Sequence, residues 1–162
     1  MVSHIAGERF LVAATLDAVQ TGQEFEHIPP HMTIVRWFQL QQNRIPRLTG
    51  AMDRIFTDQP LYQQLVGGKS RQYGEEGQFS VREILGAEDG PTIALRALIK
   101  SLGTFRSDDV YVDTFSPHVT DEPDRQVRKR EQLALPTVAL ISAHSDKRPQ
   151  RVVESFNLKA RE

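Results

Sequence analysis

The feature that most restricts the fold of this chain is a tetrapeptide that occurs twice. Residues 30–33 are Pro-His-Met-Thr, and residues 117–120 are Pro-His-Val-Thr. On a strand, successive side chains point to opposite faces, so the His and Thr of each copy share one face and the residue between them packs behind. The copies lie too far apart for a solenoid repeat. We therefore expect two half-domains, each with a sheet and a covering helix.

The segments around the two copies predict alternating strands and helices. Apolar and β-branched runs predict strands over residues 9–16, 31–38, 61–66, 78–85, 136–143 and 151–158, and each tetrapeptide begins a strand. Apolar residues at helical spacing predict helices over 43–56 and 91–102. A glycine-bearing loop is expected between the strands at 61–66 and 78–85. The pattern predicts an α+β protein with two lobes.

Composition limits both the class of protein and the chemistry. The chain has 162 residues, 39% hydrophobic and 25% charged, which predicts a single two-lobed domain over 1–162. No apolar run is long enough to cross a membrane, and the amino end has no basic start, so we expect a cytoplasmic protein. A monomer is also expected. Cysteine is absent, which excludes thiolate nucleophiles and thiolate metal sites. The net charge of −1 argues against binding to a long duplex nucleic acid.

Two Pro-His-x-Thr motifs, each opening a strand in a small cysteine-free chain with this element order, resemble the 2H phosphoesterase superfamily. The most similar branch is the 2′-5′ RNA ligase and cyclic nucleotide phosphodiesterase group. The resemblance implies a pseudo-symmetric α+β fold, in which two antiparallel sheets with outer helices surround a central cleft that both His-x-Thr pairs face. It also implies a phosphoesterase that needs no metal or cofactor. Its substrate would be a nucleotide or an RNA end with a 2′,3′-cyclic phosphate or a 2′-5′ phosphodiester bond.

Two histidines and two threonines supply the groups that this chemistry requires. In-line cleavage of a phosphodiester needs a base for the attacking oxygen and an acid for the departing oxygen, and imidazole can serve as either near neutral pH. We predict that His31 and His118 are catalytic, with His118 as base and His31 as acid, although the symmetry leaves these roles interchangeable. The hydroxyls of Thr33 and Thr120 are expected to donate hydrogen bonds to the phosphate oxygens.

Further substrate contacts are predicted from strand parity and charge. Trp37 shares the parity of His31 if the strand is regular, and could stack on a base, although core packing is the more frequent role of such a residue. Cations for a phosphate are available at Lys69, Arg71 and Arg82, although isolated basic residues are most often simply solvated. The basic run at 125–130 could meet an RNA backbone, whereas a solvated surface is the commoner role for such a run.

Two other interpretations remain open. Ile34 follows the first Thr, whereas Asp121 follows the second. Because the two copies differ in this way, the protein could instead be a non-catalytic module that binds a nucleotide in the same cleft. A zinc site is the rival chemical interpretation. Zinc takes three or four protein ligands, and the other histidines, at positions 4, 27 and 144, have no helical HExxH spacing, so no metal site is predicted.

Overall fold

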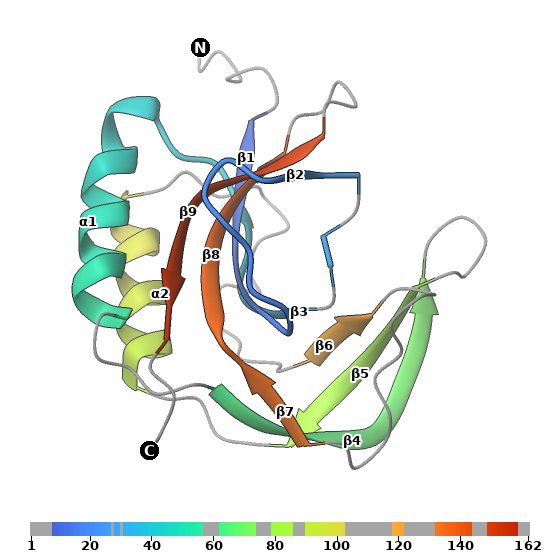
Figure 1. Ribbon diagram of the computed structural model, residues 1–162. Coiled ribbons are helices and arrows are strands. Elements are labelled where there is room, and N and C mark those ends of the chain that lie inside the picture. Colours follow the sequence, from blue (N-terminus) through green and yellow to red (C-terminus); the bar gives the residue numbers. More distant parts are fainter. Residues whose placement is uncertain are drawn as a thin grey trace.

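The computed structural model describes residues 8–26, 28–29, 31–56, 62–73, 79–85, 90–102, 118–121, 132–143 and 149–158. These residues form nine strands and two α-helices, and a short 3-10 helix at Gln42–Arg44 precedes the first α-helix (Figure 1). The strands are β1 Arg9–Thr15, β2 Glu24–Phe25, β3 His31–Phe38, β4 Tyr62–Tyr73, β5 Phe79–Leu85, β6 His118–Asp121, β7 Gln132–Leu135, β8 Thr137–Ala143 and β9 Gln150–Asn157. The helices are α1 Ile45–Phe56 and α2 Gly90–Leu102. No helix among the described residues has the length and apolarity needed to span a membrane.

All of the described strands belong to one antiparallel sheet, in the order β2-β9-β8-β1-β3-β6-β5-β4-β7. The sheet must curl, because β7 and β8 lie far apart in this order and yet only Pro136 separates them in the chain. The α+β class and antiparallel pairing are as expected. Two separate sheets were also expected, whereas the hydrogen bonds between β3 and β6 join the two halves into a single sheet.

The two faces of β1 carry different cores. Phe10, Val12 and Ala14 belong to the larger core, together with Leu48, Met52 and Phe56 of α1 and Leu95, Ile99 and Leu102 of α2. Leu11 and Ala13 belong to a smaller core on the other face, with Val19, Ala139, Ile141 and Val152. Because β1 lies inside the sheet and is covered on both faces, its sequence is a continuous apolar run rather than an alternation.

Both helices cover the same half of the sheet, which corrects the expectation of one helix for each half. α1 and α2 lie side by side (Figure 1), α1 also contacts β9, and both helices contribute side chains to the larger core. The apolar stripes that predict the helices do not specify a partner surface. Here the stripes of both helices meet the same face of β1 and β3, because that face offers the large apolar side chains.

The region between the helices also differs from the sequence prediction. β4 continues to Tyr73, through the glycines expected to form a loop, and its pairing with β5 is irregular between Val66 and Ser70. Glycines inside a strand often mark such an irregularity. β7 was not predicted, and it is an edge strand of four residues that pairs with β4. Such a short segment has too few residues to show a clear period.

Candidate functional site

The sheet brings the two motifs together at its centre. β3 and β6 are neighbouring antiparallel strands, with His31 directly opposite Thr120. The next pair is Met32 opposite Val119. The two copies therefore run side by side in opposite directions, and each His is near the Thr of the other copy. Both motifs begin their strands at the histidine, as predicted.

The register assigns the four motif positions to the face of the sheet that is opposite the helices. Met32 and Ile34 are buried in the core beneath the helices, so His31 and Thr33 belong to the other face. Residues directly opposite in an antiparallel pair share a face. Thr120 therefore occupies the same face as His31, and His118, two residues earlier on β6, does so as well. The positions of the two histidines are diagonal neighbours, roughly 7–8 Å apart.

His31 is held by the chain segment that precedes it. Its side chain is 6% exposed, and its ring atom Nδ1 lies 2.8 Å from the carbonyl oxygen of Pro29. A carbonyl oxygen can only accept, so Nδ1 is the donor. In the neutral ring, the lone pair is then on Nε2, which fixes the tautomer that a general base requires. Pro29 thus contributes to the site through its backbone, a role that the sequence pattern does not indicate.

His31 belongs to a row of polar residues that lie directly opposite one another on adjacent strands of the sheet. On one side, His31 lies opposite Thr15 of β1, which in turn lies opposite Thr137 of β8. Both threonines are fully buried. The hydroxyl of Thr15 donates to the carbonyl oxygen of Asp17 at 2.7 Å, and that of Thr137 donates to Oδ1 of Asn157 at 3.4 Å. These hydroxyls are satisfied within the fold, so we interpret them as structural neighbours of the motif.

On its other side the row continues into β5 and β4. Thr120 lies opposite Val81, and Val81 lies opposite Arg71. In the adjacent row, Glu83 of β5 lies opposite His118. The register thus adds Arg71 and Glu83 to the motif face, and Glu83 was not selected from the sequence.

Two other charged residues near the motifs, Arg82 and Asp121, belong to the opposite face of the sheet. Arg82 lies opposite Val119, which shares its face with Met32, and Asp121 alternates to that same face. The acidic residue that follows the second motif is therefore across the sheet from the motif positions. Among the three cations considered from the sequence, Arg82 is assigned to the wrong face for a phosphate contact. Lys69 lies within the irregular part of β4.

The prediction for Trp37 assumed a regular strand, and β3 is not regular. Its pairing with β1 shifts twice between Thr33 and Phe38. Ile34 and Val35 are consecutive and yet both are buried in the core beneath the helices, which strict alternation would not allow. The parity argument from His31 to Trp37 therefore fails. The side chain of Trp37 and the basic run at 125–130 lie outside what the structure describes, so their contacts with a substrate stay predictions.

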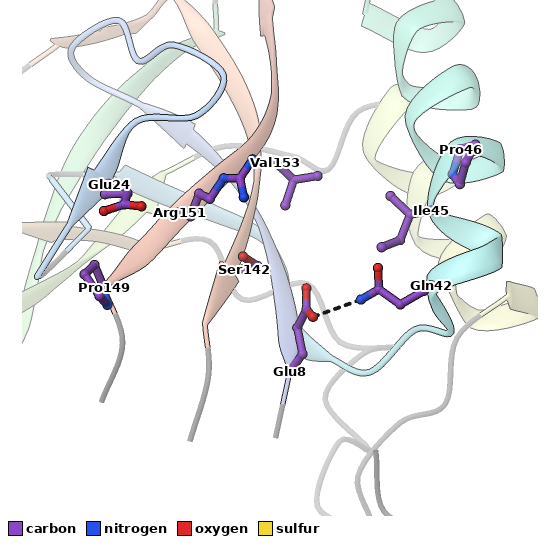
Figure 2. Close-up of a pocket in the computed structure, with 9 residues that line it drawn as sticks. All are labelled: Glu8, Glu24, Gln42, Ile45, Pro46, Ser142, Pro149, Arg151 and Val153. Atoms are coloured by element: carbon purple, nitrogen blue, oxygen red, sulfur yellow. Dashed lines mark hydrogen bonds between the residues drawn. The ribbon is translucent and has the colours of Figure 1, made fainter. Parts of the chain in front are cut away.

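An open cavity of about 680 Å³ lies at the far end of β1 from His31 (Figure 2). It is lined by Glu8, Glu24, Gln42, Ile45, Pro46, Ser142, Pro149, Arg151 and Val153. The side-chain amide of Gln42 donates to the Glu8 carboxylate at 2.9 Å. Two carboxylates and one guanidinium give this lining an excess of negative charge. The cavity contains no motif residue, and its charge is unsuited to a phosphate.

The described residues hold no group of three or more His, Asp or Glu side chains that could bind a metal ion. The histidine and threonine positions of the two motifs instead form a compact block of hydrogen-bonding and titratable residue types. Such a block can exchange protons with a ligand and bind its oxygen atoms.

Comparisons with known proteins define the fold. No protein-family model matches the chain, and no curated protein matches it. Among solved structures, a crystal structure of a phosphoesterase is 15% identical with a TM-score of 0.57, covering 94% of this chain and 99% of that one. E. coli LigT complexed with 3′-AMP gives the same four values. The protein TT0787 of Thermus thermophilus is 16% identical with a TM-score of 0.57, covering 95% of this chain and all of the other. The chain shares the fold of these proteins.

Proposed function

We propose that this protein is a metal-independent phosphoesterase of the 2H superfamily that acts on 2′,3′-cyclic phosphate or 2′-5′ phosphodiester bonds of nucleotides or RNA ends. The observation that carries the proposal is the pairing of β3 with β6, which sets the two His-x-Thr motifs opposite each other on one face of the sheet. The fold shared with a phosphoesterase and with a nucleotide complex of LigT supports it.

The mechanism follows from this arrangement. For a cyclic phosphate, one imidazole takes a proton from water as the water oxygen attacks phosphorus. The bond from phosphorus to one ribose oxygen breaks, and the other imidazole gives that oxygen a proton. The products are a phosphomonoester and a free ribose hydroxyl. Each proton transfer contributes roughly a hundred- to ten-thousandfold to the rate.

Two threonine hydroxyls complete the site. Thr33 and Thr120 belong to neighbouring antiparallel strands and share one face of the sheet by register, and we assign their hydroxyls to the phosphate. In this role they donate hydrogen bonds to the non-bridging oxygens, whose charge is redistributed in the transition state. The spacing of diagonal neighbours, roughly 7–8 Å, leaves room for a phosphate between the two histidines.

The test is turnover of a substrate panel by the full chain in the presence of EDTA. The panel contains the four 2′,3′-cyclic mononucleotides and a 2′-5′-linked dinucleotide, with products separated by chromatography. We expect turnover that is lowered about a hundredfold or more by His31→Ala or by His118→Ala and retained by His144→Ala, a histidine outside both motifs. Binding of the nucleotides without any turnover would overturn the proposal in favour of a non-catalytic nucleotide-binding module.

A further inference from the structure

The register of the sheet places a carboxylic acid residue next to one of the two histidines. Glu83 on β5 lies directly opposite His118 on β6. Residues in this relation share a face of the sheet, and their Cβ atoms are about 4.5–5.5 Å apart. The two residues are far apart in sequence, so only the pairing of β5 with β6 brings them together.

The other ionisable residues near His118 can be named strand by strand. On this face, β3 contributes His31 and β4 contributes Arg71. Lys69 of β4 directly precedes Ser70, which lies opposite Arg82, at the point where the pairing of β4 with β5 shifts. Both cations are two strands away from β6, on the far side of β5. Asp121 belongs to the opposite face. Within the described residues of β3, β5 and β6, Glu83 is therefore the acidic residue on the motif face. Two strand spacings are about 10 Å, close to the distance at which salt screens a charge, whereas Glu83 is on the strand next to β6, so Glu83 outweighs Lys69 and Arg71 at the position of His118.

His31 has a different environment. Its side chain is 6% exposed, and its Nδ1 donates to the Pro29 carbonyl oxygen at 2.8 Å. Burial disfavours the charged form of an imidazole, whereas a neighbouring carboxylate favours it. The two histidines, which the sequence presents as equivalent, therefore differ in the groups around them.

We propose that Glu83 is a positioning residue that holds His118 in its protonated form, which makes His118 the general acid and His31 the general base. This inference rests on the proposed function, and it reverses the assignment favoured by the sequence. Nε2 of His31 accepts the proton of the attacking water, and the His118 imidazolium gives its proton to the departing ribose oxygen. Glu83 remains ionised throughout the cycle.

The direct test is an NMR titration of the histidine side chains in the ¹⁵N-labelled full chain, with no substrate present. We expect Glu83→Gln to lower the pKa of His118 by about one unit, because the substitution removes a nearby negative charge. The matched control is Asp121→Asn, which removes the same charge three residues from His118 but on the other face. This control should leave the pKa of His118 within a few tenths of its wild-type value. Equal shifts in the two variants would overturn the inference.

The pH dependence of kcat/KM tests the assigned role. A general acid must be protonated, so activity is lost as the pH rises through its pKa. Lowering the pKa of His118 by about one unit moves the basic limb of the profile to lower pH by about one unit. At pH 8, on that limb, kcat/KM of the variant should then be about tenfold lower than that of the wild type. We expect Glu83→Gln to move this limb, Glu83→Asp to restore most of it, and the acidic limb to stay. Movement of the acidic limb alone would overturn the assignment.

These two measurements separate the inference from the proposed function. The titration reports on His118 whether or not the protein turns over a substrate. Wild-type protein without turnover contradicts the proposed function. Active wild-type protein in which Glu83→Gln behaves like Asp121→Asn contradicts only the role of Glu83.

Discussion

The two copies of the motif lie on strands of different length, which pair with different neighbours. β3 has eight residues and pairs with β1, a strand buried on both faces, and Met32 and Ile34 anchor it in the core beneath the helices. β6 has four residues and pairs with β3 and with β5. Burial of Met32 and Ile34 thus anchors the first copy, and the pairing of β6 with β3 sets the register of the second copy relative to it. A duplicated motif can therefore yield two residues of unequal chemistry.

The largest expected effect comes from removing either histidine. We expect His31→Ala and His118→Ala each to lower kcat/KM for a 2′,3′-cyclic nucleotide by about a hundred- to ten-thousandfold, because each removes a proton-transfer group. The double variant should be little worse than the poorer single variant, since groups that act together are not additive. Steady-state hydrolysis, with circular dichroism as a control for folding, measures this. Wild-type activity in either single variant would show that its copy of the motif is not part of the site.

A smaller effect is expected from the threonines. Thr33→Val and Thr120→Val keep the shape of the side chain and remove the hydroxyl, and a hydrogen bond to a charged group is worth about 1.5–3 kcal/mol. Each variant should therefore lose about ten- to hundredfold in kcat/KM. Similar losses would support a phosphate held by both copies. A large loss for one threonine and none for the other would mean that a single copy binds the phosphate.

The smallest effect on turnover, but a large one on stability, is expected from Met32→Ala. Met32 is 3% exposed and lies between the His and the Thr of the first copy. Truncating a buried methionine costs about 2–5 kcal/mol in the free energy of unfolding. Denaturant unfolding measures this loss, with Ile93→Ala as the control, because Ile93 is 53% exposed. If Met32→Ala is as stable as the control, the core does not anchor the first copy through Met32, and the contrast drawn between the two copies is wrong.

Local patterns in the sequence predicted most of the elements. Both motif strands, both helices and the strands at β1, β8 and β9 appear close to their expected positions. Their signals are short-range, such as apolar period, proline placement and β-branched runs. The helix over 45–56, for example, begins one residue before Pro46, in agreement with proline in the first turn.

The pairing of the strands could not be predicted in the same way. No local sequence pattern indicates that β3 pairs with β6 or that Glu83 lies opposite His118. Both arrangements depend on hydrogen bonds between segments that are distant in the sequence. The irregular pairing near Val35 likewise removes the basis of the prediction for Trp37. The sequence therefore identifies the residue types of the candidate site, and the fold supplies their neighbours.

The central claim is that both motif histidines serve one site, and ligand titration followed by NMR tests it most directly. The ¹⁵N-labelled full chain is titrated with 3′-AMP, and the side-chain resonances of His31 and His118 are assigned with the two alanine variants. We expect both imidazoles to shift with a single dissociation constant, while the remaining histidines stay unchanged. A shift of one imidazole alone, or of the two with different dissociation constants, would contradict a shared site.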